Sequence, residues 1–278
     1  MRSSFIYISA AFACAACNGI AAVLQKISAD KEKNVSSLDM RLLWRLFQKK
    51  PYILGVVLDL LGWLFTIFAV QHLPIFLVQA IIASNIVITI LVERLFRHKV
   101  IKTKSYVAIA TILAGLILLG MASSPEKIAP VVSALKWLIV LTPIPVGVAG
   151  YVLVRYKSYI STIGLAILGG LAFGGTSIVG RVFRFSQPTW HTIYSPLFFA
   201  LIASGILGML LFSIALQRAQ AAIINASTTA SQTLVPALIG IAFLGDRARN
   251  GMWYLVFLGT FLALGGVVFL ALGNKNSS

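Results

Sequence analysis

The sequence predicts an all-α integral membrane protein with nine transmembrane helices, arranged as two inverted four-helix repeats joined by a linker helix. Three observations carry this prediction: the composition, the division of the chain into apolar runs, and the placement of the basic residues. Of the 278 residues, 59% are hydrophobic and 11% are charged, which is more apolar surface than a soluble domain of this length can bury. In lipid, a helix satisfies its own backbone hydrogen bonds, so each apolar run of about 20 residues predicts a crossing.

The apolar runs follow one another with short polar connectors between them. They are Phe5–Gln25, Pro51–Val70, Ile75–Val92, Ser105–Ala122, Trp137–Val154, Tyr159–Gly180, Tyr194–Gln217, Ala221–Leu244 and Met252–Leu272. Pro143 and Pro145 predict a kink in the fifth run. In the sixth, the Gly170-x-x-x-Gly174 step predicts close contact with a neighbouring helix. We assign residues 1–122 to the first repeat, 123–156 to the linker with the fifth helix, and 157–278 to the second repeat.

A short amphipathic helix is predicted near residues 37–49. Ser36-Ser37-Leu38-Asp39 has capping-box-like spacing, and basic residues occupy one face of the segment that follows. The other face is predicted to hold Met40, Leu43, Trp44 and Phe47. The segment is too short and too charged to cross a bilayer, so we expect it to lie on the membrane surface, pinned by Trp44.

The basic residues predict the orientation. Sixteen of the 23 Lys and Arg residues fall on one side of the nine predicted crossings and seven on the other. The positive-inside rule places the first side in the cytoplasm, which predicts a multi-pass protein of the cytoplasmic membrane with its N-terminus outside and its C-terminus inside. The net charge of +16 is explained by these short loops, so we expect no nucleic-acid partner.

A weak internal repeat agrees with this topology. A shift of 146 residues lays Leu61, Gly62, Leu64, Ala69, Gln71 and Ala80 on Leu207, Gly208, Leu210, Ala215, Gln217 and Ala226. The first repeat begins outside and the second begins inside, so the two would be inserted in opposite senses. Inverted repeats of this kind build the two access states of many secondary transporters around a midplane site.

Asp59 is the first candidate functional residue, because it is the one carboxylate well inside an apolar run. A charge at this depth is costly and is expected to face the protein interior. It could bind a proton or a cationic solute and couple transport, or it could be a neutral acid bonded to Asn18 or to a backbone carbonyl. Trp63, one turn further along, could face the same cavity or the membrane interface.

Amides supply the other candidates. Asn225, Thr229 and Gln232 form a stripe at i, i+4 and i+7 on the eighth helix, and Gln79 matches Asn225 under the 146-residue shift. These side chains could line a cavity as a pseudo-twofold pair, or could serve interhelical packing. Asn85, Thr89 and Glu93 form a second stripe, and we expect Glu93 to lie at a helix end where water reaches it.

Several motifs resemble the drug/metabolite transporter superfamily, and its nine-helix members in particular. They are Phe68–Glu93 followed by Arg94, Leu113-Ala114-Gly115-Leu116, Ala215-Leu216-Gln217, Pro236, Gly245-Asp246-Arg247 and Gly265-Gly266. The second half is similar to an EamA-type repeat from Phe212 to Gly266. The family's Gly-Glu step is Val92-Glu93 in the first half and Gly245-Asp246 in the second. The resemblance implies the inverted-repeat fold and a transport function.

The resulting expectation is a secondary transporter that moves a small cationic or neutral solute by alternating access. The alternative is a magnesium or other divalent-cation transporter, or a channel-like cation pathway, as the NIPA-like members of the superfamily suggest. We expect no enzyme, since no nucleophile–base pair stands out, and no cofactor. No Walker-type phosphate loop occurs, so ATP is not expected to be the protein's own energy source. The expected partners are the solute and the lipid bilayer, and a homodimer is allowed.

Overall fold

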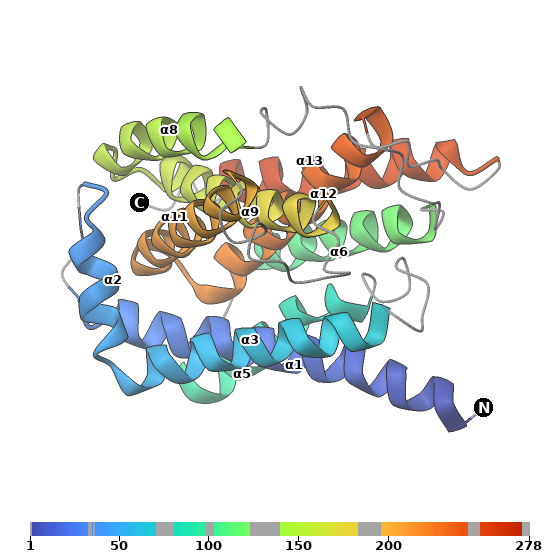
Figure 1. The fold of residues 1–278 in the computed structure, drawn as a ribbon, viewed down its shortest axis with the longest axis horizontal. Coiled ribbons are helices and arrows are strands. Elements are labelled where there is room, and N and C mark those ends of the chain that lie inside the picture. The colour runs from blue at the N-terminus through green and yellow to red at the C-terminus, as the bar shows by residue number, and fades with distance from the viewer. Residues whose placement is uncertain are drawn as a thin grey trace.

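A computed structural model describes residues 2–32, 35, 37–70, 81–97, 103–122, 140–182, 196–243 and 251–273. Within these ranges the chain forms ten α-helices and no strand, which confirms the all-helical fold class (Figure 1). The helices are α1 (Arg2–Ala29), α2 (Met40–Phe47), α3 (Lys50–Val70), α5 (Asn85–Arg97), α6 (Thr103–Ala122), α8 (Pro143–Arg155), α9 (Tyr159–Val182), α11 (Pro196–Arg218), α12 (Ala221–Phe243) and α13 (Trp253–Gly273).

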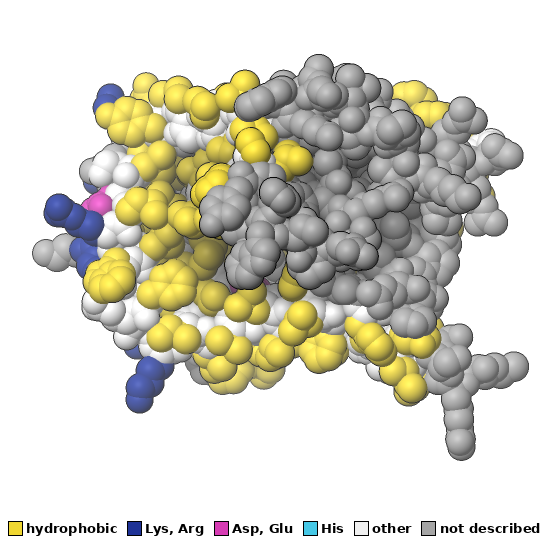
Figure 2. Space-filling view, in the orientation of Figure 1, with side chains coloured by type: hydrophobic (Ala, Val, Ile, Leu, Met, Phe, Trp, Pro, Cys, Tyr) yellow, Lys and Arg dark blue, Asp and Glu magenta, His cyan; other side chains and the backbone are white. Residues whose placement is uncertain are grey.

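Three stretches of the described chain are long and apolar enough to cross a membrane: Phe5–Ala29, Thr103–Ala122 and Pro196–Arg218. Shorter apolar stretches occur in α8, α9 and α13. Many large apolar side chains of the helices are exposed, as the yellow surface along the helices in Figure 2 shows. Exposed apolar faces on long apolar helices indicate a helical membrane protein, because lipid can cover surfaces that water would not.

The helices pack in a small set of pairs. In the first part of the chain α1 packs against α3 and α5, and in the last part α9 packs against α11 and α12. Two further pairs, α5 with α12 and α6 with α13, join the first part to the last. Glycines allow the closest approach between α6 and α13, since a Cβ on Gly115 would lie 2.6 Å from the backbone of α13.

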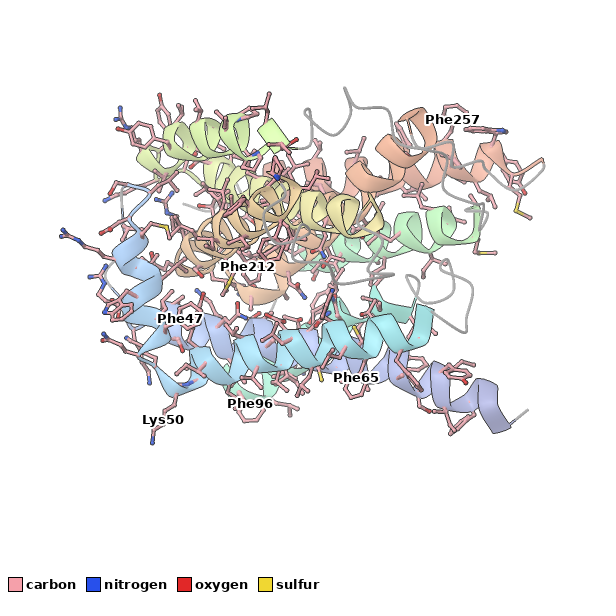
Figure 3. All side chains as sticks on the ribbon, viewed as in Figure 1. Phe47, Lys50, Phe65, Phe96, Phe212 and Phe257 are labelled. Carbon is pink, nitrogen blue, oxygen red and sulfur yellow. The ribbon has the colours of Figure 1, made fainter. Side chains whose placement is uncertain are left out.

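One end of the bundle carries α2, the end of α1, the start of α3 and the corner between α11 and α12, and we call it the α2 end (Figure 1). Dark blue Lys and Arg side chains gather there in Figure 2. Figure 3 places Phe47 and Lys50 at this end and Phe257 towards the other. The chain starts at the end opposite α2, and α13 brings it back towards the α2 end.

The predicted surface helix is present but shorter and rotated. Asp39 caps it by accepting a hydrogen bond from the Arg41 backbone N–H at 2.9 Å. Leu43, predicted to face the membrane, is buried in the bundle together with Leu42 and Leu46. Met40, Trp44 and Phe47 remain exposed. The prediction was wrong for Leu43 because a helix of this length must use one apolar face to dock on the bundle.

Two predicted crossings are interrupted by a turn within the described residues. The third, predicted as one helix over Ile75–Val92, is interrupted by a turn at Ala83–Ser84, and α5 runs from Asn85 to Arg97. The Ser84 hydroxyl donates to the Ile81 carbonyl at 2.6 Å, which stabilises that turn locally. The fifth, predicted over Trp137–Val154 with a kink, has helical residues at 140–141, a turn at Thr142 and then α8 with proline in its first turn, where a missing N–H costs nothing.

Packing around α11 and α12 is tight at the α2 end. Every residue from Leu210 to Gln217 in α11 is buried, and so is every residue from Ala221 to Thr228 in α12. Further from this end Phe199 and Ile206 of α11 are exposed, and so is Gln232 of α12. The bundle is therefore closed around α11 and α12 at the α2 end.

Candidate functional site

Asp59 lies on α3 with its side chain exposed, although Gly55 and Gly62 on either side of it are buried. The Gln25 amide of α1 donates to one carboxylate oxygen at 2.6 Å. None of the ion pairs among the described residues involves Asp59. The carboxylate is thus oriented by a neutral donor on α1.

Asn18, one of the partners considered for Asp59, is not its hydrogen-bond donor. The Asn18 amide approaches the Cys14 sulfur at 3.5 Å. A Cβ on Gly62 would overlap the side-chain oxygen Oδ1 of Asn18, so the Asn18 side chain packs directly over that glycine. Gln25, two turns further along α1, reaches Asp59 instead. Cys14, Asn18 and Gln25 share the face of α1 that contacts α3.

Trp63 follows Asp59 by one helical turn, which places both side chains on the same side of α3. The tryptophan is 56% exposed. Its ring lies one turn from an exposed carboxylate, and an aromatic face beside a carboxylate can bind an organic cation by combined ionic and cation–π attraction.

A buried polar cluster joins α1, α5 and α12 at the break in the third helix. The Asn225 amide donates to the Thr89 hydroxyl at 2.9 Å and to the side-chain oxygen Oδ1 of Asn85 at 3.5 Å. Thr89 in turn donates to the carbonyl oxygens of Asn85 at 2.9 Å and Gly19 at 3.2 Å. All three side chains are buried. Non-helical backbone at membrane depth is tolerated only where protein or an aqueous cavity surrounds it, and here protein does.

The candidate amide side chains lie in different environments, because Asn225 is buried and Gln232 is exposed. Asn225 was predicted to line a cavity with Gln79, but its side chain is 7% exposed and faces Asn85 and Thr89 of α5. Gln79 lies outside the described residues. Further along the same stripe Thr229 is half-buried and Gln232 is exposed. The stripe thus passes from a closed helix contact to an open surface, and only its open end is accessible to a ligand.

Sequence reasoning missed a cluster of charged side chains at the α11–α12 corner. Glu93, expected where water reaches it, is 1% exposed and accepts hydrogen bonds from the backbone N–H groups of Ala221 and Ala222, each at 3.0 Å. Lys26, counted among the loop cations, is buried and donates to the Leu216 carbonyl and to Asp30. In the sequence, Glu93 follows Thr89 by four residues on one polar stripe, and Lys26 directly follows Gln25. These positions could have indicated that both charged side chains face the protein interior.

Arg218 completes this cluster. Its guanidinium donates to the carbonyl oxygens of Val35 at 2.9 Å, Val154 at 2.8 Å and Tyr156 at 3.0 Å. It thereby ties the C-terminal end of α8 to the α11–α12 corner. A pocket of about 320 Å³ lies among these groups; its lining is Lys26, Asp30, Glu93, Gln217, Arg218, Ala219 and Gln220.

No protein-family model matches the chain, and neither a curated protein nor a solved structure matches it. The described residues contain no group of three or more His, Cys, Asp or Glu side chains that could hold a metal ion.

Proposed function

We propose that this protein is a secondary transporter that moves a small cationic or neutral solute across the cytoplasmic membrane by alternating access. The observation that carries the proposal is Asp59, an exposed carboxylate on a helix of a membrane bundle, held by one neutral amide. Intramembrane carboxylates are expensive and mark ion or substrate pathways. Asp59 would bind the cation or proton, and Trp63 would cover its organic part.

The pairing of the helices supports an inverted repeat. Suppose that the first-half helices α1, α3, α5 and α6 correspond, in this order, to the second-half helices α9, α11, α12 and α13. The α1–α3 contact then has the α9–α11 contact as its counterpart, and the α1–α5 contact has the α9–α12 contact. The α5–α12 and α6–α13 contacts each join a helix to its own counterpart in the other half. This is the pattern expected of two halves related by a pseudo-twofold axis, with residues 123–156 as the linker. It agrees with the resemblance to the drug/metabolite transporter superfamily.

The tight packing at the α2 end supports one access state. At the α2 end, the residues of α11 from Leu210 to Gln217 and the residues of α12 from Ala221 to Thr228 are all buried. In the predicted orientation the α2 end is cytoplasmic, so tight packing of α11 and α12 there would correspond to a conformation closed to the cytoplasm.

The proposed topology has a direct test. Reporter fusions placed after Lys102 and after Arg249 are expected to report opposite sides, the cytoplasm and the exterior respectively. The physical reason is the excess of basic residues in the loops of the first side. The same side for both fusions would contradict the inverted repeat.

Transport itself is tested by solute flux into proteoliposomes. A panel of labelled organic amines, amino acids and nucleosides is expected to contain at least one solute that the wild-type protein takes up above the rate of protein-free vesicles, with saturation. Saturable counterflow, in which unlabelled solute inside accelerates uptake of labelled solute, identifies a carrier. Large unitary currents in a planar bilayer would instead identify a channel and overturn the proposal of alternating access.

A further inference from the structure

Two charged side chains bind the helix ends at the α11–α12 corner. Each has the sign opposite to the partial charge of the helix end that it contacts. The N-terminal end of α12 carries unpaired N–H groups and a positive partial charge, and the Glu93 carboxylate accepts from two of those groups. The C-terminal end of α11 carries the opposite partial charge, and the Lys26 ammonium donates to the Leu216 carbonyl there. Both helix ends belong to the second half of the chain, and both charged side chains belong to the first.

Among these groups Glu93 has the contact best suited to open and close. Glu93 is 1% exposed, and none of the ion pairs among the described residues includes it; its two oxygens accept from the N-terminus of α12, which carries a positive partial charge. The Ala221 and Ala222 N–H groups lie in the first helical turn, where water can replace the carboxylate. The contact can therefore break without leaving buried backbone groups unpaired, provided that water enters.

We propose that Glu93 is the latch of a gate at the α2 end: its carboxylate holds α5 of the first half against the N-terminus of α12 in the second half, and the bundle opens at this end only when that contact breaks. The inference rests on the alternating-access function proposed above. The Asn225–Thr89 contact lies one turn deeper on the same two helices, and it separates once the latch is released.

A buried reporter cysteine measures the opening of this end. Ser213 of α11 is fully buried, bonds to the Tyr52 hydroxyl at 3.0 Å, and lies about one turn from Leu216. In a background with Cys14→Ser and Cys17→Ala, S213C is labelled in nanodiscs with a charged thiol reagent that reaches both membrane faces. With Glu93 present the labelling is slow, because the α2 end is closed.

Two variants remove the latch from opposite sides of the contact. Glu93→Gln removes the charge and leaves one acceptor oxygen for two N–H groups. Ala221→Pro removes one donor and puts the proline ring where the carboxylate oxygen lies, at the first helical position, where proline is otherwise tolerated. Each is expected to accelerate S213C labelling by about tenfold, the effect of losing one charge-assisted hydrogen bond. Arg94→Gln is the matched control: it also removes one charge, but from an exposed side chain, and leaves the rate unchanged.

Labelling at the wild-type rate in the latch variants that elute as monodisperse protein would overturn the latch, and so would equal acceleration by Arg94→Gln. If Glu93→Gln does not fold, Ala221→Pro decides the result alone, because the carboxylate is intact in it. Solute flux of the wild-type protein is measured in parallel. If the wild-type protein transports solute and the latch variants label at the wild-type rate, the latch is refuted and the transporter function is retained. If the latch variants label faster and the wild-type protein transports no solute, the latch is retained and the transporter function is refuted.

Discussion

Asp59→Asn is expected to bring cation uptake into proteoliposomes down to the rate of protein-free vesicles, while the protein remains folded and inserted. Asparagine has the same shape and can still accept the hydrogen bond that Gln25 donates. It loses the charge that would attract a cationic solute, a contribution of about 1.5–3 kcal/mol, or roughly tenfold to hundredfold in affinity. The measurement is initial uptake rate at a solute concentration well below saturation.

The pH dependence of uptake gives a second readout. Protons and the cationic solute compete for the same carboxylate, so acidifying the solute side is expected to weaken apparent solute affinity in the wild-type protein and to have no such effect in Asp59→Asn. Asp39→Asn is the matched control. It makes the same chemical change at the cap of α2, where asparagine caps as well as aspartate, and is expected to transport normally. Unchanged uptake and pH dependence in Asp59→Asn would show that Asp59 is structural.

Gly170→Ala is expected to destabilise the folded bundle by about 1–3 kcal/mol and to lower its melting temperature by roughly 3–10 °C. A Cβ at this position would lie 2.4 Å from the Thr228 carbonyl oxygen and 2.0 Å from the Ser231 hydroxyl. The hydroxyl can rotate away, but the carbonyl belongs to the backbone of α12, so α9 and α12 must separate. The measurement is thermal unfolding of purified protein in detergent.

Gly205→Ala is the control for this substitution. Gly205 also lies within a long helix, α11, but a Cβ there would meet nothing within 4 Å. Alanine favours helix over glycine, so the melting temperature is expected to stay the same or to rise slightly. Equal losses for the two variants would mean that the close contact between α9 and α12 does not limit stability.

The sequence by itself determined the class of fold and the position of most helices. Long apolar runs make helices because the backbone has no other partner in lipid, and that requirement is local to each run. It also determined the close contact at Gly170, which the structure confirms against α12. The sequence also identified Asp59 as a candidate functional residue, because a carboxylate within an apolar run stands out whichever helix the run packs against.

Only the tertiary structure decided which side chains meet. Gln25 instead of Asn18 reaches Asp59, Asn225 meets Asn85 and Thr89, and Glu93 is buried at the start of α12. These partners lie 34, 136 and 128 residues apart in the chain, and periodicity within a helix gives only the face on which a residue lies. Lys26 and Glu93 have the sequence pattern of loop and helix-end charges. They are buried because the ends of α11 and α12 offer backbone groups of opposite partial charge, and that arrangement exists only after the two halves have packed together.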